Sequence, residues 1–224
     1  MIRLQRVAVL YQVLVASFSL IVVMSNILSA KMVQLPIIGL TIPAGLITYP
    51  LTFLLSDLVT EIFGKKRAQL MVYLAFAMSM LSFGMIQVGL VLPTVDPEQK
   101  KAFDSVLGLS GLRIFSSLVS YITAQILGIQ IYAMIKKWTG PNLLWLRNNG
   151  ATFLSQLIDT VLIDLIFLWW GLGLSMQLVF PIMLFSYLYK AFFSVACTPI
   201  FYFLVFLIRG RTQTSLLESA ARRR

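Results

Sequence analysis

Long apolar runs without a charged residue alternate with short polar segments along this chain. The charge-free runs are 7–30, 32–56, 68–95, 114–135, 165–189 and 191–208. Backbone groups buried in lipid must form their hydrogen bonds within one segment, so runs of this length predict membrane-spanning helices. Glycine and proline residues within 36–45 and 171–181 indicate loops there. The pattern predicts six helices, at about 7–29, 43–63, 68–92, 111–136, 149–171 and 181–208.

The composition supports a membrane protein. The chain has 224 residues, of which 59% are hydrophobic and 12% are charged, and its mean hydropathy is +0.89. A soluble domain is about half apolar and a quarter charged, so this chain has too much apolar surface to bury in water. We therefore expect an all-α multi-pass membrane protein. Residues 1–210 are expected to form one six-helix transmembrane domain, and residues 211–224 a basic tail.

The basic residues give the orientation of these helices. Two of the 18 Lys and Arg residues, Arg113 and Lys190, fall inside predicted helices. Cytoplasmic loops of membrane proteins are enriched in Lys and Arg, so the more basic side is predicted to be cytoplasmic, with both termini on it. The less basic side holds Lys31, Lys100 and Lys101. The more basic side holds Arg3, Arg6, Lys65, Lys66, Arg67, Lys136, Lys137, Arg147, Arg209, Arg211 and Arg222 to Arg224.

Two short stretches of the chain are alike. They are Thr52-Phe53-Leu54-Leu55-Ser56-Asp57 and Thr152-Phe153-Leu154-Ser155-Gln156, and each lies on the second helix of a three-helix half. Halves with three spans each have opposite orientations in the membrane, as in transporters built from inverted repeats. A 3+3 inverted repeat is therefore one interpretation, and a chance match of three residues is the other.

Several classes of chemistry are excluded or disfavoured. The chain has no histidine and a single cysteine, Cys197, so the usual metal ligands and near-neutral proton shuttles are missing. Membrane topology accounts for the net charge of +10, so we expect no nucleic-acid partner. We expect no cofactor, no metal site and no catalytic residue. An intramembrane enzyme with Asp57 and Asp159 as an aspartyl dyad is the weaker alternative.

Ionisable residues inside the predicted helices are the most informative feature. Each costs about 2.5–3.5 kcal/mol on insertion scales unless it is paired or hydrated, so such residues usually have a function. Asp159 is near the middle of the fifth helix, and Lys190 is at a similar depth in the sixth. Thr152, Ser155 and Gln156 share the helix face of Asp159. The two polar faces can meet, either as a binding site or as an ion pair that only holds the bundle together.

Other polar residues have two interpretations each. Asp57 and Glu61 lie one turn apart on the second helix, and Glu61 precedes Lys65 by one turn, so a salt bridge at the membrane interface is an equal explanation for Glu61. Asp57 lies deeper and has no local partner. Asn26 in the first helix is either a ligand contact or an interhelical hydrogen-bonding group.

The chain resembles the bacterial queuosine precursor transporter family, whose members are inner-membrane proteins with six helices. The resemblance extends in order along nearly the whole chain. The similar residues are Ser25-Asn26, Gln34-Leu35-Pro36, Tyr49-Pro50-Leu51-Thr52-Phe53-Leu54-Leu55-Ser56-Asp57, Glu61-Ile62-Phe63-Gly64, Arg113-Ile114, Gln125, Ser155-Gln156-Leu157-Ile158-Asp159-Thr160, Tyr187 and Lys190.

This resemblance implies uptake of queuosine precursors for tRNA modification: 7-cyano-7-deazaguanine, 7-aminomethyl-7-deazaguanine or queuine. A guanine-like edge has adjacent N–H donors that one carboxylate can accept, with Asp159 as first candidate and Asp57 as second. Gln156 and Asn26 would bond to the carbonyl and ring nitrogens, and Lys190 would balance the acids. An aromatic ring would cover the flat face of the base. The candidate rings are Tyr49, Phe53 and Tyr187, and the candidates for proton coupling are Asp57, Glu61 and Asp159.

A second interpretation is a substrate-binding membrane component of an ATP-driven importer of vitamins or nucleobases. The chain lacks a phosphate-binding Gly-Lys-Ser/Thr loop, so an energising ATPase would be a separate protein. Under either interpretation the partners are a small purine-like molecule and membrane lipid. The sequence leaves open whether the chain forms a homodimer.

Overall fold

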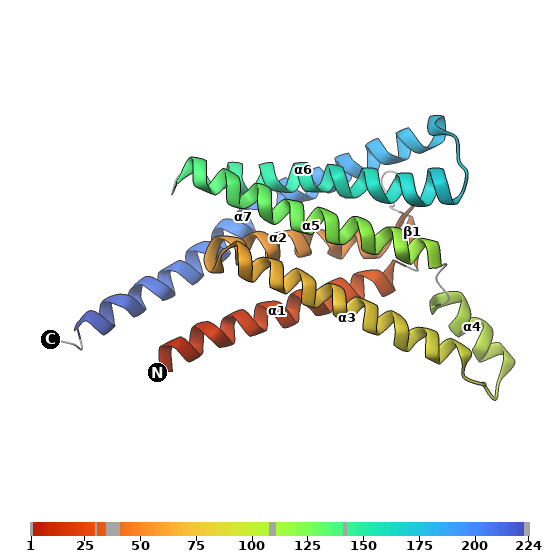
Figure 1. Ribbon diagram of the computed structural model, residues 1–224, viewed down its shortest axis with the longest axis horizontal. Helices are drawn as coiled ribbons and strands as arrows, with labels where there is room; N and C mark the ends of the chain where they lie inside the picture. The colour runs from red at the N-terminus through yellow and green to blue at the C-terminus, as the bar shows by residue number, and fades with distance from the viewer. Residues whose placement is uncertain (1, 30, 35–40, 108–110, 141–142, 222–224) are drawn as a thin grey trace.

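The computed structural model describes residues 2–29, 31–34, 41–107, 111–140 and 143–221. It is a bundle of long helices that lie side by side (Figure 1). The six long helices overlap the six ranges predicted from the apolar runs. They are α1 (Ile2–Leu28), α2 (Gly45–Phe63), α3 (Lys65–Val91), α5 (Gly111–Thr139), α6 (Leu144–Asp164) and α7 (Met176–Ala221).

Within the described part of the chain, five segments are long and apolar enough to cross a membrane: Val7–Leu28, Lys65–Val91, Ser116–Thr139, Leu144–Gly171 and Met176–Ile208. Many large apolar side chains on these segments are exposed on the outside of the bundle, as a lipid-facing surface requires. The protein is therefore an all-helical, multi-pass membrane protein, as its composition predicts.

The helix α2 lies at the centre of the bundle. It contacts α1, α3, α5, α6 and α7. Residues 52–54 and 56–61 of α2 are all buried, including two acids and several hydroxyl groups. This central position explains why α2 can carry charged residues, since neighbouring helices rather than lipid surround them.

Two short strands and one short helix are missing from the sequence-based prediction, and one segment predicted as α-helix is π-helical. Two short antiparallel strands, β1 (Met32–Gln34) and β2 (Thr41–Pro43), connect α1 to α2. The helix α4 (Pro97–Leu107) has no buried residue and mixes acids with lysines, so its apolar positions are too few for a membrane span. A π-helical segment, η1 (Leu165–Gly171), continues α6. Part of the predicted Gln34-Leu35-Pro36 loop lies outside the described residues.

Two helices, α6 and α7, have ends that differ from the prediction. The helix α6 begins at Leu144 instead of position 149, so it includes Arg147. The helix α7 runs from Met176 to Ala221 and contains both Pro181 and Pro199, whereas we predicted a start at 181 and an end at 208. Transmembrane helices tolerate proline because neighbouring groups satisfy the freed backbone carbonyls. Residues 222–224 of the predicted tail lie outside the described residues.

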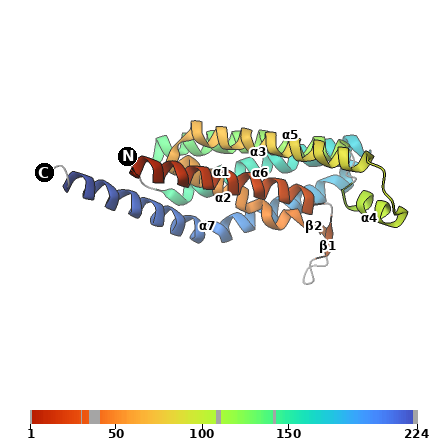
Figure 2. The same cartoon turned by 90° about the horizontal axis from the view of Figure 1, so that it is seen from below.

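Both termini lie at one end of the bundle, which we call the terminal end (Figures 1 and 2). The connections from α2 to α3 and from α5 to α6 are also at this end, so Lys65, Lys66 and Arg67, and Lys136 and Lys137, are there. The strands and α4 lie at the opposite end (Figure 2). The basic segments therefore gather at one end, as the positive-inside distribution requires.

Candidate functional site

The buried face of α6 is almost entirely polar. Helices α5 and α7 pack against α6, and α2 also contacts it. A spanning helix buries its polar side against protein because lipid offers no hydrogen-bond partners. This face is the centre of the candidate site. Its buried residues include Asn148, Asn149, Thr152, Ser155, Gln156, Asp159, Thr160 and Asp164.

Asp159 and Lys190 form a buried ion pair between α6 and α7. Lys190 Nζ lies 2.6 Å from Asp159 Oδ2 and donates a second hydrogen bond to Thr160 Oγ1 at 3.1 Å. Both charged side chains are more than nine-tenths buried. The polar faces of the two helices therefore meet at these residues, as their spacing in the sequence predicts.

Aromatic side chains complete the surroundings of this ion pair. The Tyr49 hydroxyl donates to Asp159 Oδ1 at 3.0 Å, and Lys190 Nζ lies 5.4 Å from the centre of the Tyr49 ring. The Phe53 ring is 5.6 Å from Tyr49, and the Tyr121 ring is 6.4 Å from it. Tyr121 is buried on α5, and its hydroxyl has no hydrogen-bond partner among the described residues. Tyr121 is not among the predicted site residues, because a tyrosine in an apolar run gives no separate signal in the sequence.

Asp57 lies in the same interior but has different partners. Its Oδ2 is 3.1 Å from Thr152 Oγ1, on the face of α6 that also carries Asp159. The Thr152 hydroxyl is also 2.8 Å from the backbone carbonyl oxygen of Asn148. Asp57 is buried and has no ion pair among the side chains that the structure describes.

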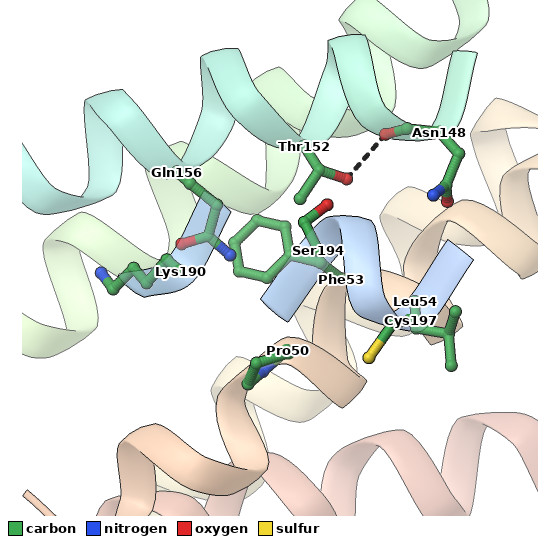
Figure 3. A pocket seen from close by; sticks show the side chains of 9 residues that line it. All are labelled: Pro50, Phe53, Leu54, Asn148, Thr152, Gln156, Lys190, Ser194 and Cys197. Carbon is green, nitrogen blue, oxygen red and sulfur yellow. Dashed lines mark hydrogen bonds between the residues drawn. The ribbon is translucent and has the colours of Figure 1, made fainter. Parts of the chain in front are cut away.

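A pocket opens between α2, α6 and α7 (Figure 3), and we call it the Asp159 pocket because Lys190, the ion-pair partner of Asp159, lines it. Thr152 and Gln156 contribute from α6, and Phe53 contributes from α2. Its volume is about 10 Å³, which is room for one water molecule, so a larger ligand requires the helices to separate. Nine residues line it: Pro50, Phe53, Leu54, Asn148, Thr152, Gln156, Lys190, Ser194 and Cys197.

Gln156 has an unused acceptor at this pocket. The side chain is almost fully buried, and its Oε1 atom has no hydrogen-bond partner among the described residues. A buried polar atom without a partner usually costs about 1–3 kcal/mol. A ligand that donates to Gln156 would remove this cost, so the atom is a candidate contact for a polar molecule.

Glu61 belongs to a second charged group, at the terminal end of the bundle. Its carboxylate lies 3.1 Å from Lys136 Nζ and 3.5 Å from Arg147 Nη2, and it accepts a hydrogen bond from Tyr132 at 3.1 Å. We call these four residues the Glu61 cluster. The proposed salt bridge from Glu61 to Lys65 is wrong, because Glu61 points into the bundle while Lys65 is exposed.

The place of Arg147 in the structure differs from the one predicted for it. We assigned it to a cytoplasmic loop, but it is a fully buried residue of α6 that also donates to the Gly140 carbonyl oxygen. The apolar run from 149 suggested a later helix start. The polar sequence Arg147-Asn148-Asn149 gave no sign that Arg147 pairs with Glu61 on α2 and that Asn149 bonds to Thr198 on α7.

Other predicted site residues lie elsewhere. Asn26 lines a separate pocket of about 70 Å³ between α1, α3 and α5, where Ser117 donates to its Oδ1 at 3.5 Å. It is separated from the Asp159 pocket because α1 packs against α2 and α3. Tyr187 is half-buried on α7 and does not line the Asp159 pocket. The side chain of Arg113 lies outside the described residues.

The described residues offer no metal site. They contain no group of three or more His, Cys, Asp or Glu side chains that could hold a metal ion. The arrangement instead provides carboxylate acceptors, an amide and aromatic rings around a small pocket. Such groups suit a flat, neutral or cationic molecule with N–H donors.

Comparisons with known proteins agree with this chemistry. The family described as "Putative vitamin uptake transporter" matches residues 43–204. A protein of Bacillus subtilis (strain 168) named "Probable queuosine precursor transporter" is 31% identical over 141 residues. That match covers 62% of this chain and 60% of the relative, so the chain spans less than two thirds of the relative's length. No solved structure matches the chain. The resemblance to queuosine precursor transporters is thereby confirmed.

Proposed function

The chain belongs to the family of vitamin uptake transporters, and from this premise we propose that it imports 7-deazaguanine precursors of queuosine. The cargo would be 7-cyano-7-deazaguanine, 7-aminomethyl-7-deazaguanine or queuine, used for tRNA modification. The printed name of the Bacillus subtilis relative supports this cargo. The structural observation that carries the proposal is the Asp159–Lys190 pair beside the pocket, because a buried ion pair contributes little net stability.

In this proposal the Lys190 ammonium takes the place of the cargo when the site is empty. Lys190 neutralises Asp159, so the closed interior holds no unpaired charge. When a base enters, its two N–H donors replace the Lys190 donor at the Asp159 carboxylate. The Gln156 amide accepts from or donates to the base, and Phe53 and Tyr49 cover its flat face. Asn26 and Tyr187 do not belong to this set, because Asn26 lines a different pocket and Tyr187 does not line this one.

The same proposal includes the topology. Six long helices would cross a bacterial inner membrane, and the terminal end would face the cytoplasm because the basic loops gather there. The α1–α3 and α5–α7 halves would be inverted repeats that move against each other around the Asp159 pocket. Transport, and no covalent chemistry, would be the whole activity.

Rescue of queuosine in transfer RNA tests the proposal. The host would lack precursor synthesis and its own transporter, and would keep the downstream enzymes, including one that inserts queuine. Each base is supplied at low concentration. We expect at least one base to restore queuosine with the wild-type chain and with Asp104→Asn, a matched change on the exposed helix α4. Asp159→Asn should not restore it.

A second measurement distinguishes the proposed self-contained transporter from a component of an ATP-driven importer. Purified wild-type protein in liposomes should exchange a labelled base by itself. Exchange that requires a copurifying ATPase would favour the alternative. A wild-type chain that is present in the membrane and exchanges no deazaguanine base would contradict the proposed cargo.

A further inference from the structure

Four buried carboxyl groups lie on α2 and α6, namely Asp57, Glu61, Asp159 and Asp164, and their partners differ. Glu61 lies within 3.5 Å of both Lys136 and Arg147. Asp159 is held by Lys190 at 2.6 Å. For Asp57 the hydrogen-bond partner is the Thr152 hydroxyl, and no cation lies within ion-pair distance among the described side chains. Asp57 and Asp164 thus have no cation within ion-pair distance among the described side chains. Of these two, Asp57 is the more deeply buried and bonds to Thr152, which lines the pocket, whereas Asp164 does not line it.

The contacts of Thr152 indicate which form of Asp57 is present. A hydroxyl has one hydrogen to donate. Thr152 Oγ1 lies 2.8 Å from the Asn148 carbonyl oxygen and 3.1 Å from Asp57 Oδ2. A carbonyl oxygen and an ionised carboxylate can both only accept hydrogen bonds, so each would need the hydrogen of Thr152. One hydrogen cannot serve both oxygens well. If Asp57 carries a proton, its O–H donates to Thr152 while Thr152 donates to Asn148, and both contacts become good hydrogen bonds.

We propose that Asp57 is the proton-binding group that couples base uptake to the proton gradient, and that it is protonated whenever the bundle is closed. The inference rests on the proposed function, because it assigns the energy source of that same pocket. Glu61 and Asp159 are then not the coupling group, since each is paired with a cation in the closed bundle.

The geometry gives a physical reason for the coupling. An ionised carboxylate in a dry interior is costly unless a cation or water accompanies it. Asp57 can lose its proton only where helices separate and admit water. It gains a proton when the pocket faces the outside, where the O–H bond forms. That bond breaks after the pocket opens to the cytoplasm, and the proton leaves with the base.

A metal cation fits Asp57 less well than a proton does. Hard cations are bound by several oxygen ligands, whereas Asp57 has one hydroxyl partner among the described residues. The charged and titratable groups on the packed helices have contacts of their own. They include Tyr11 and Arg67 on α1 and α3, Tyr132 and Lys136 on α5, Arg147 and Asp159 on α6, and Lys190 on α7. Asp164, at the end of α6, differs from these groups, because its Oδ2 atom has no hydrogen-bond partner among the described residues.

The test uses the purified chain in liposomes with labelled 7-cyano-7-deazaguanine, 7-aminomethyl-7-deazaguanine and queuine as probes. An inward gradient of one pH unit should drive about tenfold accumulation for one proton per base, since one unit is a tenfold difference in proton activity. Asp57→Asn should lose this accumulation but still exchange internal for external base. Asp104→Asn should behave as wild type.

The outcomes separate the two proposals. Absence of exchange of all three bases by the wild-type protein contradicts the proposed function. Wild-type exchange without accumulation in a pH gradient, or with accumulation driven by sodium, overturns the role of Asp57 alone. Accumulation that survives in Asp57→Asn overturns it as well. An asparagine amide can donate to Thr152 as a protonated acid does, so the variant should unfold at the wild-type temperature. A variant that fails to fold would show that Asp57 is ionised.

Discussion

The guanidinium of Arg147 lies 3.5 Å from the Glu61 carboxylate and joins the start of α6 to the end of α2. Arg147 has no exposed surface, and Glu61 is almost as deeply buried. Lys136 adds α5 to the same contact. Three helices therefore meet through one carboxylate at the terminal end of the bundle, between the Asp159 pocket and the basic loops.

The Glu61 cluster should be important for stability. Glu61→Gln leaves both Arg147 and Lys136 without their carboxylate, so we expect the free energy of unfolding to fall by about 3–5 kcal/mol, as for other buried pairs that lose one partner. Denaturant unfolding of the purified protein in detergent would measure the loss. Lys65→Gln is the control, because Lys65 is exposed and should change stability by about 0.5 kcal/mol at most. Equal losses of stability in both variants would support a salt bridge between Glu61 and Lys65 instead.

Much of the fold follows from the sequence because lipid imposes simple rules. A long charge-free run must become a helix, and the basic loops must gather on one side. These rules do not apply where the chain leaves the bilayer. The helix α4 therefore escaped prediction because its polar residues resemble those of a loop, and the pair of strands escaped it because proline and glycine residues in that segment indicate a loop.

The site follows from the sequence only in part. Helix periodicity indicates that Asp159 and Lys190 face inward, and the structure brings them together. Periodicity cannot indicate which helices are neighbours, so it could not separate Asn26 from the Asp159 pocket or connect Glu61 with Arg147. Those pairings depend on how the six long helices pack, which no local pattern specifies.

Lys190 should be less critical than Asp159. We expect Asp159→Asn to abolish uptake while the protein still reaches the membrane, because the acceptor for the base is lost. Lys190→Met should reduce uptake by a smaller factor, since Asp159 can take up a proton and keeps its bond from Tyr49. Initial uptake rates, normalised to the amount of protein in the membrane, would measure both. An undiminished rate in Lys190→Met would place Lys190 outside the site.

Gly45 should be required where α1 and α2 cross. A Cβ atom at this position would overlap the backbone oxygen of Ser25 and the side-chain Oγ of Ser29. Backbone cannot yield as a flexible side chain can, so Gly45→Ala should destabilise the protein by about 1–3 kcal/mol or more. Gly84→Ala on α3 is the matched control, because a Cβ there meets no atom within 4 Å. It should leave stability unchanged or raise it by up to about 1 kcal/mol through helix propensity. The two melting temperatures, measured in the same detergent, test this difference.

Gln156 allows binding to be separated from folding. Its Oε1 atom is buried without a partner among the described residues, so the amide contributes little to stability in the closed bundle. Gln156→Leu removes the unpaired oxygen and should keep or raise the unfolding temperature. The same change removes a donor and acceptor for the base, and we expect uptake at low substrate concentration to fall about tenfold, since one hydrogen bond is worth about 1 kcal/mol or slightly more. Gln12→Leu, on an exposed face of α1, is the matched control and should change neither quantity. A Gln156→Leu protein with wild-type uptake would remove Gln156 from the binding site, and one with a clearly lower unfolding temperature would assign it a structural role.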